Sequence, residues 1–214
     1  MRRTPSLPVL FVLLAALLAI ALAAGIAWMR LNTRSASSAD GTGGEIAVAT
    51  GIQIGGPYSL IAQDGSRVTD ESFQGKFQLI FFGFTFCPDV CPTELAQIAA
   101  AMERMGPDAQ KIQPIFITVD PERDTPEAMG EYVRHFDPRF IGLTGSRQEI
   151  DQVISAYRVF ARKVQEPNSS QYVMDHSTFL YLLGPDGEFV TMYRYGTEPE
   201  ELAKSLKGYV DAAG

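Results

Sequence analysis

The feature that most restricts the fold of this 214-residue chain is an almost unbroken apolar run, Phe77–Phe82, followed closely by a helical pattern. A short apolar run without alternation indicates a strand that is buried on both faces. After Pro92, apolar residues recur at helical spacing as far as Met105 and share one side: Leu95, Ile98, Ala99 and Met102. A strand that is covered on both faces belongs to a central sheet with helices on each side.

The remaining segments alternate between strand and helix patterns around this unit. In chain order, we expect a hairpin over 58–69, a buried strand over 115–117, helices capped by Thr125 and Ser146, a second hairpin over 179–195 and a final helix capped by Thr197. This order predicts an α/β domain in which a mixed central sheet is flanked by helices. The arrangement resembles the thioredoxin-like one.

Both cysteines of the chain, Cys87 and Cys91, follow the first buried strand, where thioredoxin-like proteins keep their chemistry. Because Pro92 disfavours helical geometry in its predecessor, we expect Cys91 to be the cap residue of the helix. At that position the free N–H groups and the helix dipole stabilise a thiolate. Two such thiolates are suited to disulfide exchange, with Cys87 and Cys91 forming the disulfide, or to binding a soft metal ion. A redox-inert pair is the alternative, and the turn residues around the pair argue against it.

Three residues separate the cysteines, which leaves room for an ion, and two sulfurs rarely complete a metal site. The histidines of the chain are His135 and His176. His135 ends a predicted amphipathic helix, where a histidine most often complements the helix C-terminus. His176 directly precedes a strand that, in a thioredoxin-like topology, runs beside the cysteine loop. We therefore predict His176 as the third ligand and Asp175 as the group that orients its ring. A backbone hydrogen bond for His176 and a turn role for Asp175 are the alternatives.

Two thiolates and one imidazole suit copper better than zinc. Soft sulfur ligands select Cu(I), which accepts three ligands, whereas a structural zinc ion usually takes four protein ligands. A carboxylate from Asp89 or Asp175 would complete a zinc site, so zinc stays an alternative.

Three motifs together resemble the Sco/SenC family of copper chaperones, over roughly residues 50 to 210. They are Phe82-Gly83-Phe84-Thr85 leading into Cys87-Pro88-Asp89-Val90-Cys91-Pro92-Thr93, the loop 120–126, and Asp175-His176 before Gly184-Pro185-Asp186-Gly187. The resemblance implies that Cys87, Cys91 and His176 bind copper. It also implies a partner, subunit II of cytochrome c oxidase, whose dinuclear copper site is filled or whose cysteines are kept reduced. It identifies no copper donor.

The loop 120–124 has two interpretations. Its charged residues suit contact with a partner or a copper donor, while Asp124 and Thr125 also make an ordinary start for a helix. The structural interpretation is the one that we favour.

The amino-terminal region indicates a membrane anchor. Residues 7–29 carry no charge, and as a helix they would span about 34 Å, enough for a hydrocarbon core of about 30 Å. We expect residues 1–30 to be a signal anchor with one transmembrane helix, 31–50 a flexible linker and 51–214 the folded domain. The domain would then lie on the outer, periplasmic-type face of the inner (cytoplasmic) membrane. A secretory signal cleaved after Ala21-Leu22-Ala23 is the alternative.

The charge distribution argues against a nucleic-acid partner. The first 34 residues hold four of the 18 basic residues and none of the 25 acidic ones, which leaves 14 basic against 25 acidic residues in the remainder. Nucleic-acid binding needs a basic face. Such an acidic domain is compatible with a basic protein partner.

Three functions compete at the cysteine pair. A copper chaperone uses both sulfurs and His176, a thiol–disulfide reductase uses the sulfurs alone, and Thr85-Phe86-Cys87 mildly resembles the loop of a peroxidase. Oxidation to a disulfide removes both thiolate ligands, so the redox state would control metal affinity. The first two functions therefore share one site, and the sequence leaves open whether the chain is also an enzyme.

Overall fold

A computed structural model describes residues 44–46, 48, 51, 53–165 and 171–213. The expected anchor, residues 1–30, and most of the expected linker, 31–50, lie outside the described residues. In the described part of the chain, no helix combines the length and the hydropathy needed to cross a membrane.

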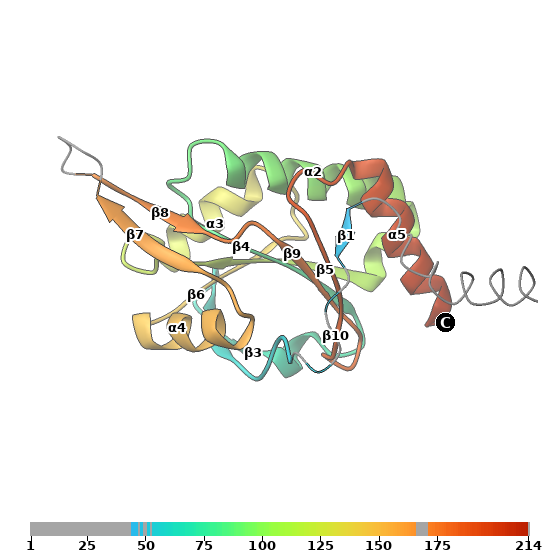
Figure 1. The fold of residues 1–214 in the computed structure, drawn as a ribbon, viewed down its shortest axis with the longest axis horizontal. Helices are drawn as coiled ribbons and strands as arrows, with labels where there is room; N and C mark the ends of the chain where they lie inside the picture. The colour runs from blue at the N-terminus through green and yellow to red at the C-terminus, as the bar shows by residue number, and fades with distance from the viewer. Residues whose placement is uncertain (1–43, 47, 49–50, 52, 166–170, 214) are drawn as a thin grey trace, which may run out of the picture. The chain divides into compact units, whose positions relative to one another are not determined.

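Among the described residues, eight strands form one mixed sheet in the order β1-β10-β9-β4-β5-β6-β2-β3 (Figure 1). Their bounds are Glu45–Ile46 (β1), Ser59–Ala62 (β2), Arg67–Thr69 (β3), Phe77–Gly83 (β4), Ile112–Thr118 (β5), Ile141–Thr144 (β6), Leu180–Leu183 (β9) and Phe189–Tyr193 (β10). Strands β4, β5 and β6 are parallel to one another, and the other pairs are antiparallel. Gly83 of β4 pairs with Thr118 of β5, so both strands end at the same edge, where the cysteine loop begins.

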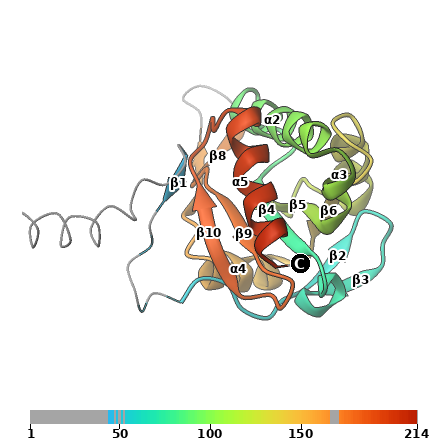
Figure 2. The same cartoon turned by 90° about the vertical axis from the view of Figure 1, so that its right-hand side faces the viewer.

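Helices cover both faces of the sheet (Figure 2). Helices α2 (Val90–Met105) and α5 (Pro199–Ala212) lie side by side on one face, and α3 (Pro126–Arg134) packs on β6. Helix α4 (Arg147–Ala156) lies on the opposite face. Two 3-10 helices, η1 (Asp70–Phe73) and η2 (Gly106–Lys111), complete the connections.

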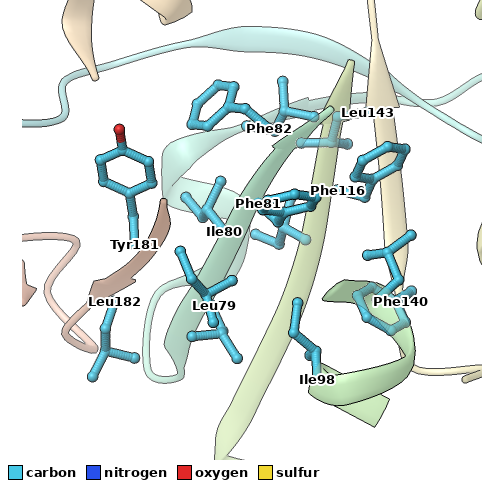
Figure 3. Close-up of a cluster of buried hydrophobic side chains, with 14 of the residues drawn as sticks. Leu79, Ile80, Phe81, Phe82, Ile98, Phe116, Phe140, Leu143, Tyr181 and Leu182 are labelled. Carbon is cyan, nitrogen blue, oxygen red and sulfur yellow. The ribbon is translucent and has the colours of Figure 1, made fainter. Parts of the chain in front are cut away.

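Strand β4 is buried along its whole length, as its apolar run predicts. Phe81 stacks on Phe116 of β5 with ring centroids 6.1 Å apart, and Phe82 meets the ring of Tyr181 edge-on at 5.7 Å (Figure 3). Each such buried side chain stabilises the fold by roughly 1.5–3 kcal/mol. The strand from which the cysteine loop starts is therefore fixed by packing on both faces.

The predicted α/β architecture is confirmed: the domain is a mixed sheet with helices on both faces, in a thioredoxin-like arrangement. Both predicted hairpins are present, as β2–β3 and β9–β10. The side chains of Thr125 and Ser146 cap α3 and α4 as expected.

The cap predicted at Thr197 is wrong. Helix α5 begins at Pro199 after Glu198, and no side chain caps it. The hydroxyl of Thr197 donates instead to the carbonyl of Arg194 at 2.8 Å and closes the preceding turn. A proline in the first turn has no N–H to satisfy, so this helix start depends less on a side-chain cap.

The structure contains two elements that the sequence did not indicate. Strand β1 pairs with β10 inside the range 31–50, which was expected to be a linker. Strands β7 (Ala161–Gln165) and β8 (Tyr172–His176) pair with each other as a separate two-stranded sheet that projects from the domain (Figure 1). Charged residues interrupt both strands of this hairpin, so no buried apolar run marks them.

Candidate metal centre

The cysteine loop, residues 84–89, connects the carboxyl end of β4 to α2. Helix α2 starts at Val90 after Asp89, so Cys91 lies in its first turn and the prediction that Cys91 is the cap residue is wrong. The N–H of Cys91 donates to Cys87 Sγ at 3.3 Å, and Pro92 has no N–H that would need a partner. A proline is tolerated in the first turn of a helix, and here the helix begins two residues before it.

Cys91 is fully buried against β4, whereas Cys87 is partly exposed. A Cβ atom at Gly83 would lie only 2.7 Å from Cys91 Sγ and 2.7 Å from the ring of Phe116. The missing side chain at Gly83 therefore creates the space that the sulfur occupies.

His176 ends β8 and places its Nε2 atom 3.7 Å from Cys91 Sγ, across 85 residues of chain. Its Nδ1 atom lies 2.8 Å from the carbonyl oxygen of Ser177, which only accepts, so Nδ1 carries the proton of the neutral ring. The rings of Phe81 and Phe84 meet the imidazole edge-on at 6.4 and 5.8 Å and restrict its rotation. Nε2 is left with a free lone pair directed at the sulfur.

Asp175 and His135 have other partners. Asp175 is exposed and pairs with Arg162 at 3.4 Å, while the carbonyl of Ser177 orients the ring that Asp175 was expected to orient. Side chains at successive positions of a strand point to opposite faces, which separates Asp175 from the ring of its neighbour. His135 follows α3, and its Nδ1 atom contacts the carbonyl of Glu131 in that helix at 2.6 Å.

The two sulfurs have opposite electrostatic environments. Hydrogen bonds from the Cys91 thiol and from the N–H groups of Cys91 and Asp89 lower the pKa of Cys87 to about 4, against an opposing effect of burial. The hydrogen bond to Cys87, together with burial, raises the pKa of Cys91 far above its ordinary value. At neutral pH the pair is therefore a Cys87 thiolate that accepts the S–H of Cys91.

The two sulfurs and the imidazole nitrogen are suitable ligands for a soft metal ion, although in this structure hydrogen bonds determine their positions. Within the described ranges, no group of three His, Cys, Asp or Glu residues is already positioned as a metal site. Cys87 supplies a thiolate and His176 a free lone pair, while Cys91 still carries its proton. Two thiolates and an imidazole are the ligand types that suit Cu(I).

The loop between β5 and α3 contributes residues whose contacts the sequence did not reveal. Asp124 is fully buried and accepts hydrogen bonds from Thr85 of the cysteine loop and from Thr118. Arg123 lies between the rings of Phe86 and Tyr172. The loop 120–124 thus contacts both segments that carry the candidate ligands. A charged loop after a buried strand was the available signal, and it did not show which residues the loop touches.

A profile of the SCO1/SenC family matches residues 47–211. The chain belongs to the SCO1/SenC family. The human mitochondrial SCO1 homologue is 43% identical over 158 residues, which are 72% of this chain and 52% of the human protein. The chain spans about half the length of the curated relatives that it matches first, from 46% to 61%. The resemblance seen in the cysteine and histidine motifs is confirmed.

Solved structures of SCO1/SenC proteins show the same fold. Bradyrhizobium japonicum ScoI, solved with copper bound, is 51% identical, covers 73% of this chain and 99% of its own, and superposes with a TM-score of 0.68. BsSco, described as having a disulfide switch and as a member of a family of cytochrome c oxidase assembly proteins, is 25% identical with a TM-score of 0.59, over 78% of this chain and 98% of its own. Copper and disulfide chemistry thus both occur in SCO1/SenC relatives.

Proposed function

We propose that this chain is a membrane-anchored copper chaperone that binds copper through Cys87, Cys91 and His176. It would help to assemble the dinuclear copper site of cytochrome c oxidase subunit II. The observation that carries the proposal is the meeting of a cysteine pair and an imidazole from separate segments, with Cys91 Sγ and His176 Nε2 3.7 Å apart. The copper bound by the Bradyrhizobium relative and the assembly role described for BsSco support it.

The chemistry of the residues explains how the site would take its cargo. Cys87 is already ionised and His176 already presents a lone pair, so Cys91 is the ligand that must lose a proton. Metal binding would release this proton and replace the S–H hydrogen bond between the sulfurs. Asp175 is engaged by Arg162, which removes one carboxylate that a four-ligand zinc site would use.

Copper titration of the reduced full-length chain tests the ligand set. We expect one Cu(I) per chain, no tight binding after Cys87→Ala or Cys91→Ala, and at least a tenfold loss of affinity after His176→Ala, because loss of outer-shell partners alone costs about 10–100-fold. His135→Ala is the matched control and should bind as the unchanged chain does. Equal losses in the two histidine variants, or tighter binding of Zn²⁺ than of Cu(I), would contradict the proposal.

The proposed topology follows the sequence. Residues 1–30 would form a single-pass anchor, 31–50 a tether that also contributes β1, and 51–214 the copper-binding domain on the outer face of the membrane. The uncharged run of residues 7–29 supports this arrangement. The mitochondrial location stated for the human relative is compatible with a membrane that houses an oxidase.

Thiol–disulfide exchange is the second candidate function, and the state of Cys87 favours it. A partly exposed sulfur with a pKa of about 4 is a ready attacking thiolate, and Cys91 lies beside it to resolve a mixed disulfide. Exchange needs the sulfurs but no imidazole ligand. Oxidase assembly that survives His176→Ala but fails with Cys87→Ala would make reduction the function. Failure of both variants, with exchange intact in His176→Ala, would make copper transfer the function.

A further inference from the structure

We propose that the β5–α3 loop, residues 119–125, is an internal bracket that holds the cysteine loop and the histidine strand together, with Arg123 as its main positioning residue. This inference rests on the proposed function, because it assigns the bracket a role in setting the distance between ligands. It concerns residues that would not touch the metal. The loop was expected only to start a helix or to contact a partner.

The first arm of the bracket is the Arg123 side chain. Its guanidinium carbon lies 4.6 Å from the ring centre of Phe86 and 3.8 Å from that of Tyr172. Phe86 directly precedes Cys87, and Tyr172 lies on the same strand as His176. One planar cation therefore contacts both ligand-bearing segments, through interactions that are worth about 0.5–2 kcal/mol each.

Hydrogen bonds fix the orientation of this cation. Arg123 Nη1 donates to the carbonyl of Tyr172 at 3.0 Å, and Nε donates to Asp120 Oδ2 at 2.5 Å. The hydroxyl of Tyr172 donates to the other oxygen of Asp120 at 3.0 Å. Because Asp120 is almost fully buried and Arg123 is partly buried, solvent screens this ion pair less than a surface pair. Strand β8 is thus attached to the loop through the backbone carbonyl and the side-chain hydroxyl of Tyr172.

The second arm is Asp124. Its carboxylate accepts from the N–H of Thr85 at 3.1 Å, from the hydroxyl of Thr85 at 2.5 Å and from the hydroxyl of Thr118 at 2.5 Å. The hydroxyl of Thr144 on β6 donates to the backbone carbonyl of Asp124 at 2.7 Å. Asp124 therefore connects Thr85, two residues before Cys87, to the ends of the core strands β5 and β6.

The topology explains why such a bracket is needed. Strand β8 pairs only with β7 among the described strands, so no ladder of backbone hydrogen bonds connects it to β4. Residues 177–179 link His176 to β9, which pairs with β4, and side-chain contacts across the gap then hold β8 itself against the cysteine loop. Arg123 makes several of these contacts on both sides, and Lys163 of β7 adds an ion pair to Glu122 of the same loop at 2.5 Å.

The variant Arg123→Lys tests the bracket in the full-length reduced chain. Lysine keeps the charge but cannot stack between two rings while donating to Asp120 and to the Tyr172 carbonyl. In the metal-free protein, a nuclear Overhauser effect between His176 Hε1 and the Cys91 Hβ protons reports their proximity, and we expect it to be lost or weakened severalfold. We expect Cu(I) affinity to fall at least tenfold, as for other outer-shell losses.

The matched control is Arg139→Lys, which alters another partly buried Arg–Asp pair, with Asp137, in the α3–β6 connection. It should keep the Overhauser effect and the copper affinity of the unchanged chain. Equal losses in both variants, or an unchanged Overhauser effect and affinity in Arg123→Lys, would overturn the bracket.

A second variant serves if Arg123→Lys fails to fold. Thr85→Val removes one donor to Asp124 at nearly constant volume and should weaken Cu(I) binding without changing the hairpin. Copper affinity equal to that of the unchanged chain would remove Asp124 from the bracket. If the unchanged chain binds no copper, the proposed function fails, while the Overhauser effect in the metal-free variants still decides whether the bracket exists.

Discussion

At the scale of single residues, Gly83 sets how closely α2 approaches the sheet. The variant Gly83→Ala would place a Cβ atom 2.7 Å from Cys91 Sγ and from the ring of Phe116, both of which lie in a packed core. We expect the free energy of unfolding to fall by about 1–3 kcal/mol, the usual cost of overpacking, and Cu(I) affinity to fall as Cys91 moves. Urea denaturation and copper titration measure the two effects.

Gly208→Ala is the control for this experiment. Gly208 lies in α5, and a Cβ atom there would meet nothing within 4 Å. Replacing an exposed helical glycine by alanine should stabilise the fold by up to about 1 kcal/mol. If Gly83→Ala were as stable as Gly208→Ala and bound copper normally, Gly83 would not be determining the position of the sulfur.

Glu94 gives a residue-scale prediction about pH. It is fully buried in α2, its Oε2 atom accepts from the N–H of Gly196 at 3.0 Å, and burial raises its pKa from 4.5 to about 7. The raised pKa means that the folded state holds the proton more tightly. Protonation of Glu94 therefore contributes fully to the free energy of unfolding below about pH 4.5, and this contribution is lost as the pH rises through 7.

Glu94→Gln should remove this pH dependence. The amide keeps an oxygen for the N–H of Gly196 and does not ionise, so we expect the variant to exceed the unchanged chain by up to about 3 kcal/mol in unfolding free energy at pH 8. The gap should shrink at pH 5. Urea denaturation at both pH values measures it, with exposed Glu103→Gln in the same helix as control. Parallel stability curves for Glu94→Gln and the unchanged chain would refute the prediction.

Among the candidate site residues, the sequence singled out those whose chemistry is rare. Cys87, Cys91 and His176 stand out by type, and the structure places Cys91 and His176 side by side. Arg123 and Thr85 are common residue types whose roles arise only when distant segments pack together. Their contacts depend on tertiary structure, which a linear pattern does not contain.

At the scale of elements, β7–β8 should be the least protected part of the sheet structure described here. Its strands pair only with each other, whereas β4 pairs on both sides. Two-stranded hairpins are marginal on their own. We expect amides of β7 to exchange with solvent at least about tenfold faster than those of β4, as measured by hydrogen exchange with mass spectrometry. Protection of β7 equal to that of β4 would show that the hairpin is docked more firmly than its pairing indicates.

The elements also show which patterns in the sequence were sufficient. The apolar run of β4 and the caps at Thr125 and Ser146 are local signals, and each predicted its element. The hairpin β7–β8 has no apolar face of comparable strength, because charged residues lie along it. At α5 a proline in the first turn competed with the capping pattern of Thr197 and determined the helix start.

At the scale of the whole molecule, the proposed anchor makes a prediction about topology. A membrane-impermeant protease added to the outer face of intact inner-membrane preparations should degrade the domain, while protease added to the inner face should not. The expected reason is a positively charged amino terminus held inside by the uncharged run of residues 7–29. A mature chain that begins near Ala24 and is free in the soluble fraction would show that the segment is a cleaved signal.

The spacing between the candidate ligands also has a consequence for the folding of the chain. Cys91 and His176 are 85 residues apart, so their meeting is a non-local contact that forms only after the hairpin has docked on the sheet. A chain truncated or cleaved before His176 would carry the cysteine pair without the imidazole. Such a chain would bind copper weakly, so high copper affinity would indicate that folding is complete. The metal site would then act as a checkpoint that releases only correctly folded molecules into copper delivery.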